Sequence, residues 1–255
     1  MVSYAKWDNF KDSDSESDAE QTQRVAAAQL AVEHHNPIPN IITQTSKDGF
    51  PHADDWRVVN GAVADDEFLM LLYRDKEARA FVTKDYPWFA DTYEKLGHGV
   101  ERADLFRYLA IHHSAGYYAD TDVMPLAPVG EWLSRYGWEH GKDNFNAINL
   151  LVVGVEFPWE ADGNPFQLCQ WTFAASRPQH PVIYACASAA VDNVKAITYS
   201  KDTITKRTGP VAFTKAIVDF LRANDCGGAV DALAKDFAVP SRARCSESGS
   251  LHNRI

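Results

Sequence analysis

The chain has 255 residues, enough for one large domain or two small ones with a buried core. Its hydrophobic fraction of 45% and charged fraction of 24% are ordinary for a globular protein and exclude wholesale disorder. The 25 Lys and Arg against 35 Asp and Glu give a net charge of −10, which excludes a broad basic surface for nucleic acid. A phosphate-bearing small ligand is not excluded, because one bound divalent cation reverses the local field.

The N-terminal 35 residues are expected to form an acidic, flexible leader. Residues 1–20 carry six acidic side chains among serines, and an alanine-rich stretch at 24–33 indicates a short helix. No apolar run approaches the roughly 20 residues that cross a bilayer, so no integral membrane segment is expected in this chain. The four cysteines contain no CxxC pair, so neither a disulfide scaffold nor a zinc site is predicted.

After the leader, apolar runs alternate with helical patterns. The runs predict strands at residues 37–42, 67–73, 117–119 and 149–156. Apolar spacing, prolines and glycines predict helices at 75–84, 88–96, 101–113, 164–176, 181–194 and 211–223. This alternation predicts an α/β fold with a mostly parallel central sheet flanked by helices. We expect one domain over residues 36–240 and a tail over 241–255.

An acidic pair follows the short strand at 117–119. Asp120 and Asp122 stand at i and i+2, so on a strand their side chains would point to the same side. At the carboxyl end of a strand in an open α/β sheet, two such carboxylates form an oxygen site for Mg²⁺ or Mn²⁺. The spacing alone is weak, because surface loops contain many such pairs by chance.

The preceding helix adds a second charged pair. Asp104 and Arg107 are three residues apart and share one helix face that leads into the acidic strand end. A carboxylate there can accept hydrogen bonds from sugar hydroxyls, and a guanidinium can bridge hydroxyls or phosphate. The alternative is a surface ion pair without a ligand. The residues alone leave both interpretations open.

Four segments together resemble a known family. The segment ADLFRYLAIHHSAGYYADTDV (103–123) resembles the core motif ADxxRYxxLxxxGGxYxDxD of glycosyltransferase family 32, the DXD-containing sugar transferases. IPNIITQT (38–45) is similar to the opening IPKIIHQTW segment. LCQWTFAASRPQHP (168–181) and RTGPVAFTK (207–215) resemble the QWTxxSxPxHP and TGPxxFT segments of the initiating α-1,6-mannosyltransferase-like branch. The four segments keep the family's order over most of the chain.

The resemblance implies a GT-A-like nucleotide-diphospho-sugar transferase fold. It also implies Mn²⁺ or Mg²⁺ and retaining transfer of a hexose, with mannose expected, from a GDP- or UDP-hexose to a glycan or glycolipid hydroxyl. By this resemblance Asp104 and Arg107 orient the donor sugar, and Asp120 and Asp122 hold the metal, with Asp122 the direct ligand. The residues expected to contact the donor are Ile41, Thr43, Gln44, Tyr73, Asp120, Gln170, Trp171 and Gly209.

Two aromatic assignments stay open. Tyr73 and Trp56 are equal candidates for stacking on the nucleotide base, and the sequence does not choose between them. Trp171 fits a sugar-stacking residue, and it equally fits a buried core position at helical spacing from Leu168 and Ala175. Each aromatic side chain therefore has both a functional and a structural interpretation.

The sequence also departs from the family pattern. Thr43 replaces its histidine and Ser46 its tryptophan, and residues 248–255 lack the family's His or Asn followed by Ser-Trp. The changes at positions 43 and 46 predict a different packing of the nucleotide. The missing C-terminal segment favours the main alternative, a catalytically inactive nucleotide-sugar or glycan-binding module. A metal-dependent phosphohydrolase is a lesser alternative. Such enzymes carry the acidic motif on the first strand, whereas here the motif comes after the third predicted strand. As written the chain fits the cytosol, whereas a preceding N-terminal anchor would place it in the Golgi lumen.

Overall fold

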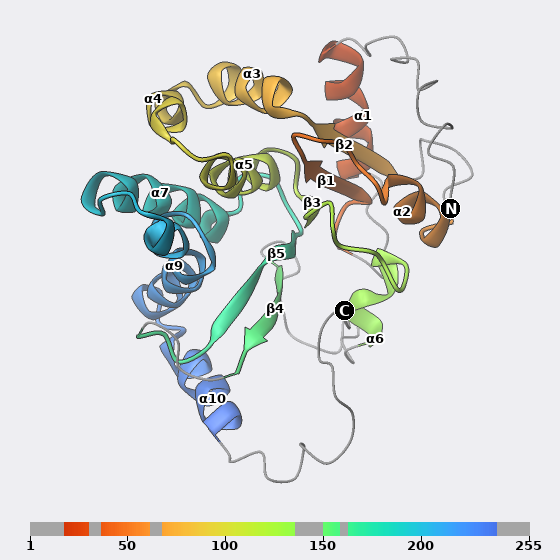
Figure 1. Ribbon diagram of the computed structural model, residues 1–255. Helices are drawn as coiled ribbons and strands as arrows, with labels where there is room; N and C mark the ends of the chain where they lie inside the picture. The colour runs from red at the N-terminus through yellow and green to blue at the C-terminus, as the bar shows by residue number, and fades with distance from the viewer. Residues whose placement is uncertain (1–17, 31–36, 62–67, 136–149, 159–162, 239–255) are drawn as a thin grey trace, which may run out of the picture.

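A computed structural model describes residues 18–30, 37–61, 68–135, 150–158 and 163–238 (Figure 1). The core of the fold is a five-stranded sheet in the order β2-β1-β3-β5-β4. Its strands are β1 (Ile41–Thr45), β2 (Leu69–Tyr73), β3 (Gly116–Ala119), β4 (Leu151–Phe157) and β5 (Gln167–Ala175). The predictions for residues 1–17, 31–36 and 241–255 lie outside the described residues.

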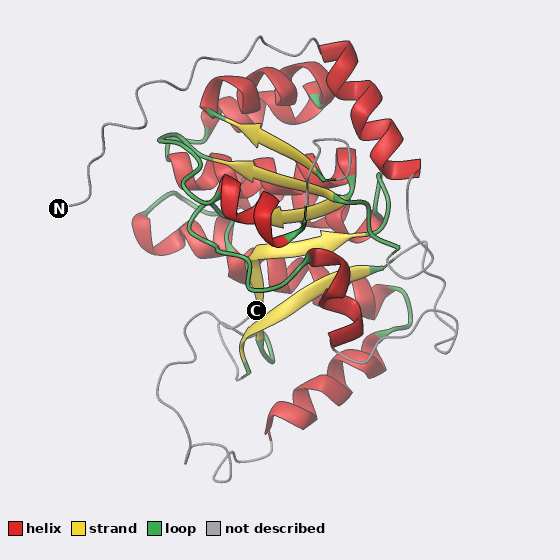
Figure 2. Ribbon diagram, turned by 90° about the vertical axis from the view of Figure 1, so that its right-hand side faces the viewer, coloured by secondary structure: helices red, strands yellow, loops and turns green. Residues whose placement is uncertain are grey.

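The sheet is mixed, with one reversed strand. β1 pairs in parallel with both β2 and β3. β5 runs antiparallel to β3, and β4 runs antiparallel to β5, so β5 alone opposes the direction of the others. The predicted α/β class is confirmed, and the expected parallel arrangement holds for the other strands. Figure 2 shows the strands side by side in this single sheet.

The helix predicted for residues 164–176 is wrong, because most of this segment forms β5. Asn164-Pro165 is typical of a helix start, but the segment that follows pairs on both sides, with β3 and with β4. Nearly all of β5 is buried, including the polar residues Gln167, Gln170 and Thr172, so its sequence does not alternate between buried apolar and exposed polar positions. The helical spacing of Trp171 from Leu168 and Ala175 therefore has no structural meaning here.

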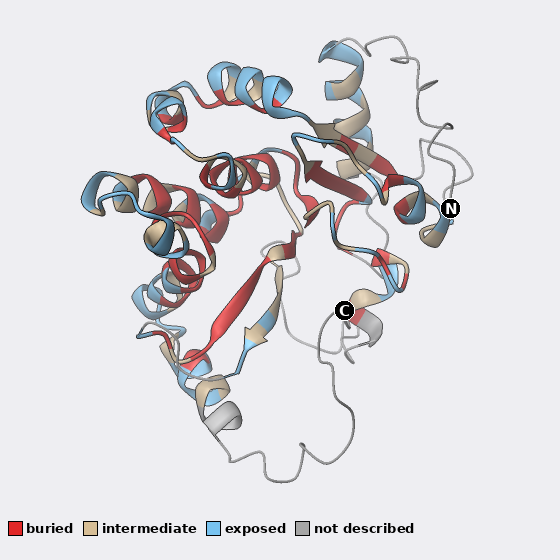
Figure 3. Cartoon of the chain, viewed as in Figure 1, coloured by how far each residue is buried: buried red, intermediate tan, exposed pale blue. Residues whose placement is uncertain are grey.

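One face of the sheet carries the larger hydrophobic core (Figure 3). The elements packed on it lie to one side of the sheet in Figure 1. They are α3 (Asp75–Asp85), α4 (Pro87–Lys95), α5 (Gly99–Ser114), α7 (Pro181–Ala196), α9 (Pro210–Ala223) and α10 (Gly227–Ala238). The first five match predicted helices within a few residues, whereas α10 was not predicted. Short helical turns η3 (Lys201–Thr203) and α8 (Ile204–Arg207) connect α7 to α9.

The opposite face is covered by α2 (Ala53–Val59), η1 (Val129–Glu131) and α6 (Trp132–Arg135), of which none was predicted. Trp56 of α2 is fully buried there and packs against Trp132 with ring centroids 6.4 Å apart. Its indole N–H donates to the carbonyl oxygen of Val123 at 3.1 Å. Trp56, on this face of the sheet, therefore anchors the loop at Val123, which follows the acidic pair.

Helix α1 (Asp18–Leu30) covers part of edge strand β2. Val25 and Ala28 pack against the buried residues Ile41, Leu69 and Leu71. Part of the expected leader thus contacts the sheet, although the domain boundary at residue 36 stays a prediction. Within the described segments, no helix combines the length and apolarity needed to span a bilayer.

A tight connection joins α5 to β3 and fixes where the acidic pair begins. Ala115 and Gly116 both have positive φ, 59° and 82°. A Cβ on Gly116 would collide with the carbonyl oxygen of Ile41 and lie 2.9 Å from the Cβ of that residue. Glycine is therefore required at position 116 both by its backbone conformation and by the closeness of β1.

Gly116→Ala is expected to lower the free energy of unfolding by about 2–3 kcal/mol, because the strand must shift to admit the methyl group. Urea unfolding followed by circular dichroism measures this loss. Gly97→Ala is the matched control, since nothing lies within 4 Å of its added Cβ and its φ is not positive. Equal stability of the two variants would contradict the close approach of β1.

Candidate functional site

The acidic pair lies at the carboxyl end of β3, as the sequence predicts, but not on the strand itself. β3 ends at Ala119, and the Asp120 backbone N–H still donates to the carbonyl oxygen of Trp171 at 2.8 Å. Asp122 is exposed in the turn that follows. The expected placement of both carboxylates on one face of a strand is therefore wrong, because the chain turns after Asp120. The two acids lie in different surroundings.

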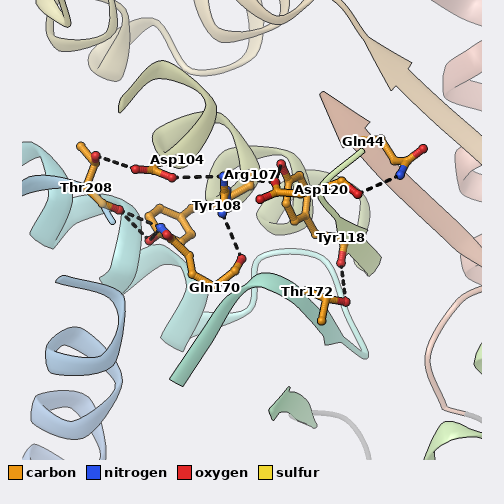
Figure 4. Close-up of polar contacts among 9 residues, drawn as sticks. All are labelled: Gln44, Asp104, Arg107, Tyr108, Tyr118, Asp120, Gln170, Thr172 and Thr208. Atoms are coloured by element: carbon orange, nitrogen blue, oxygen red, sulfur yellow. Dashed lines mark hydrogen bonds and ion pairs between the residues drawn. The ribbon is translucent and has the colours of Figure 1, made fainter. Parts of the chain in front are cut away.

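Arg107 of α5 joins the two charged pairs (Figure 4). One terminal nitrogen, Nη2, lies 3.1 Å from Asp104 Oδ1 and 3.2 Å from Asp120 Oδ1. The other, Nη1, donates to the carbonyl oxygen of Gln170 at 3.2 Å. The side chain of Arg107 is only 6% exposed, and its guanidinium carbon lies 4.9 Å from the ring centre of Tyr118. Asp104 and Arg107 are thus no surface pair, since Arg107 connects α5 to both β5 and the acidic turn.

Asp120 is held on one side and open on the other. The Tyr118 hydroxyl donates to Asp120 Oδ1 at 2.7 Å, so this oxygen serves both Tyr118 and Arg107. The Gln44 side-chain amide donates to the Asp120 carbonyl oxygen at 3.3 Å. The carboxylate is 31% exposed, and no contact of Oδ2 is found in the described part of the chain. One oxygen of Asp120 is therefore fixed and the other is available to a ligand.

Asp104 is buried and still strongly hydrogen-bonded. Its carboxylate is 4% exposed, and the Thr208 hydroxyl donates to Oδ2 at 2.8 Å. Burial raises the pKa of Asp104 to about 6, against the opposing effects of the Arg107 charge and the Thr208 hydrogen bond. Near neutral pH Asp104 is ionised although burial disfavours its charged form, and such a perturbed pKa is typical of functional carboxylates.

Thr208 is itself fixed from two directions. Its carbonyl oxygen accepts a hydrogen bond from the Tyr108 hydroxyl at 2.9 Å and one from the Gln170 amide at 2.8 Å. The Gln170 amide also donates to the Tyr108 hydroxyl. A Cβ on the neighbouring Gly209 would lie 2.7 Å from the Cα of Thr205, so the turn at this point is tight. Gln170 and Gly209 are therefore both buried beside Thr208, and Gln170 helps to hold the backbone of the residue that bonds to Asp104.

The other residues expected at the donor are spread along β1, β2 and β5. Ile41 is fully buried in the small core beside α1. Tyr73 packs against Phe81 and Phe106, with ring centroids 5.7 and 4.9 Å away. Thr43 is fully buried next to β3, and Trp171 is partly exposed. The structure brings Gln44, Asp104, Arg107, Asp120 and Gln170 into one network, whereas Gly209 is only the chain neighbour of Thr208. Donor contact by all of the expected residues stays a prediction.

Sequence reasoning missed three aromatic supports of this network. Tyr118 lies under Arg107, Tyr108 holds Thr208, and Trp56 anchors the loop after the acidic turn. Tyr108 could have been found, because it stands four residues after Asp104 and so shares its helix face. Trp56, one of the two candidates for base stacking, is instead fully buried on the opposite face of the sheet.

A pocket of about 380 Å³ lies at the end of β1 and the start of α5. Its lining residues are Thr45, Ser46, Lys47, Asp75, Tyr93, Gly99, Val100, Arg102 and Ala103. Thr45 ends β1 and Gly99 begins α5, so the pocket lies where these two elements of the site meet, although no residue of the network lines it. The carboxyl ends of parallel strands are the usual place for ligands in open α/β sheets.

The acidic turn suits a divalent cation that shares its shell with a ligand. Asp120 Oδ2 and the exposed Asp122 offer carboxylate oxygens, the donors that Mg²⁺ and Mn²⁺ prefer. Within the described residues, no group of three or more His, Cys, Asp or Glu side chains could enclose a metal by itself. Such a cation would therefore complete its shell with water and phosphate oxygens, as magnesium does at many phosphate sites.

The fold and this network define an α/β protein with a polar site at the carboxyl edge of its sheet. Residues 17–138 match the family described as "Glycosyltransferase sugar-binding region containing DXD motif". Residues 17–138 therefore carry the sugar-binding DXD region of this family, the family expected from the sequence.

Named relatives agree with this match. The initiation-specific α-1,6-mannosyltransferase of Schizosaccharomyces pombe is 31% identical over 214 residues, which are 76% of this chain and 51% of that protein. Inositol phosphoceramide mannosyltransferase 3 of the same organism is 34% identical over 133 residues, 51% of this chain and 35% of that protein. Among solved structures, PaToxG Glycosyltransferase aligns with a TM-score of 0.48 and 15% identity, covering 87% of this chain and 85% of that chain. The chain spans about half the length of the initiation-specific mannosyltransferase.

Proposed function

We propose that this chain is a metal-dependent, retaining hexosyltransferase of GT-A type. It moves a hexose, with mannose as the first choice, from a nucleotide sugar to a hydroxyl of a glycan or glycolipid. The observation that carries the proposal is the bridge that buried Arg107 makes between Asp104 and Asp120. This bridge fixes the distance between Asp104, a carboxylate that can accept hydrogen bonds from sugar hydroxyls, and the acidic turn at Asp120. The mannosyltransferase relatives support the choice of sugar.

In this proposal the acidic turn binds the diphosphate end of the donor. Asp120 Oδ2 and Asp122 would hold Mn²⁺ or Mg²⁺, which stabilises negative charge on the departing diphosphate. Arg107 and Tyr118 hold Asp120 Oδ1, so that the second oxygen stays turned to the ligand. The two acidic partners of Arg107, Asp120 and Asp104, are thus assigned to the two ends of the donor.

Asp104 binds the sugar end of the donor. Its carboxylate accepts hydrogen bonds from sugar hydroxyls while Thr208 and Arg107 keep it in place. The pocket of about 380 Å³ takes the nucleoside. The acceptor oxygen bonds to the anomeric carbon as the bond to the diphosphate breaks, and a diphosphate oxygen takes the acceptor proton. Retention in this step rests on the resemblance to the family.

A panel of nucleotide sugars tests the proposal. The chain is mixed with GDP-mannose, GDP-glucose, UDP-glucose or UDP-N-acetylglucosamine, each with Mn²⁺ and with EDTA in its place. We expect one donor to raise the melting temperature in Mn²⁺ only, and to release its nucleoside diphosphate slowly, faster with a mannoside acceptor. A ligand present at a concentration of 100 times its Kd stabilises the folded state by about 2.7 kcal/mol, which such a melting experiment detects.

The other outcomes separate the alternatives. Metal-dependent binding without release, with or without acceptor, identifies an inactive binding module. Release of inorganic phosphate from a phosphomonoester identifies a phosphohydrolase. A chain that binds no nucleotide in the presence of metal would refute the proposal.

A further inference from the structure

A buried ion pair lies one helical turn from Asp104 and is not used by the proposed chemistry. Arg207 Nε donates to Glu101 Oε1 at 2.7 Å, where the Glu101 side chain is 0% exposed and that of Arg207 is 7% exposed. Glu101 lies in α5, whereas Arg207 ends the short helix α8. The pair therefore ties a one-turn helix to the helix that carries the site.

Stability alone does not account for this pair. Removing two charges from water costs about as much as their attraction returns, and apolar replacements of such pairs are often neutral or stabilising. Glu101 Oε2 is also buried without a hydrogen-bond partner in the described part of the structure, so the acid is not fully compensated. What an ion pair of this kind supplies is a fixed geometry, since its members bond well in one arrangement only.

The fixed geometry passes directly to Asp104. Arg207 and Thr208 are consecutive, and their side chains bond to Glu101 and Asp104, two acids three residues apart on one face of α5. Arg207 Nη1 also donates to the carbonyl oxygen of Ile197 at 2.5 Å. The segment at Arg207 and Thr208 is therefore held in register along α5, and it cannot slide without breaking both contacts.

We infer that Glu101 and Arg207 are positioning residues for Asp104, acting through the hydroxyl of Thr208. Arg207 sets the place of α8, α8 sets the place of Thr208, and Thr208 directs Asp104 Oδ2. The inference rests on the proposed function, because it assigns this orientation to the binding of the donor sugar. It predicts damage to recognition of the sugar and none to binding of the nucleoside diphosphate.

The experiment compares GDP-mannose with GDP in the wild type, Arg207→Met, Arg207→Lys and Thr208→Val. Arg207→Met and Thr208→Val should each lower kcat for donor hydrolysis about tenfold, since small misplacements of orienting groups have large effects. The Kd for GDP with Mn²⁺ should stay within twofold of the wild type. The double variant should lose no more than the stronger single variant, because both changes act on one chain of contacts. Arg207→Lys should recover part of the loss.

Ile183→Ala in α7 is the matched control, since Ile183 is fully buried and belongs to the hydrophobic core alone. It should melt earlier than the wild type yet keep kcat per folded molecule. Parallel loss of kcat and GDP binding in Arg207→Met, or wild-type kcat in both Arg207→Met and Thr208→Val, would overturn the inference. Thr208→Val keeps the test valid where Arg207→Met fails to fold.

The two proposals fail in different ways. If the wild type binds donors without turnover, the transferase proposal fails, and the inference is read from the ratio of the Kd values for GDP and GDP-mannose. Arg207→Met should then bring this ratio toward 1. If GDP-mannose binds no more tightly than GDP in the wild type, no sugar contact exists to be positioned, and the inference fails as well.

Discussion

Asp122→Asn is expected to lower donor turnover by about 1,000-fold. A metal ion at a reacting phosphate contributes several kcal/mol of charge stabilisation, and each 1.36 kcal/mol corresponds to a tenfold change in rate. Asp122 is exposed and Asp120 already shares one oxygen with Arg107 and Tyr118, so Asp122 is the freer carboxylate. The neutral amide keeps the size of the side chain and removes the charge that binds the cation. Turnover measured over a Mn²⁺ titration checks this result.

The variant should fold like the wild type. No hydrogen bond or ion pair of the Asp122 side chain is found among the described residues, so its melting temperature without ligand should not change. Asp192→Asn is the control, an exposed acid on α7 whose loss should leave turnover unchanged. Turnover of Asp122→Asn within twofold of the wild type would remove Asp122 from the metal site.

The elements that the sequence predicts well are those with a local signal. Helices α3, α4, α5, α7 and α9 have apolar spacing together with a proline or glycine at one end, and their predicted ranges agree with the structure. The sequence does not reveal β5, because this strand is buried along nearly all its length and shows no strand-like alternation. Trp56 in α2 was considered as a ligand-binding residue, because sequence does not say which face of the sheet a short helix covers.

In the site too, the sequence predicts contacts between residues close in the chain and does not predict contacts between distant ones. The spacing of Asp104 and Arg107 indicated a shared helix face, and the structure confirms their contact. The sequence does not reveal that Arg107 also reaches Asp120, or that Thr208, 104 residues away from Asp104, donates to it. Such contacts depend on how α5 and α8 pack, which is a property of the whole fold. The family motifs mark these residues without giving their partners.

Asp104→Asn is expected to lower turnover by about 100-fold and to stabilise the protein at neutral pH. A hydrogen bond to a charged group contributes about 1.5–3 kcal/mol, which corresponds to roughly 10- to 100-fold in rate. The buried carboxylate meanwhile destabilises the fold, since burial raises its pKa to about 6 in spite of Arg107 and the Thr208 hydroxyl. Asparagine can still accept the hydrogen bond of Thr208 and carries no charge to bury.

The pH dependence fixes the sign of this effect. The folded-state pKa of Asp104, about 6, lies above its ordinary value of 3.8, so the folded state binds the proton more tightly. The stability from this proton is fully present below about pH 4 and is lost as the pH rises through about 6. The difference between the two pKa values corresponds to about 3 kcal/mol. Wild type and Asp104→Asn should thus be similarly stable at pH 4, and the variant should be more stable at pH 7.

Turnover should follow the same ionisation in the opposite sense. In the wild type, kcat/KM should fall as the pH drops below about 6, because the protonated acid no longer binds sugar hydroxyls as an anion. Asp104→Asn should lose this acid limb together with most of its activity. Urea unfolding at both pH values and a kcat/KM profile of each protein measure the two effects separately. A variant that is less stable than the wild type at pH 7 would show that Asp104 is a structural ion-pair residue, whereas gained stability with lost turnover identifies a carboxylate kept for its ligand at the expense of the fold.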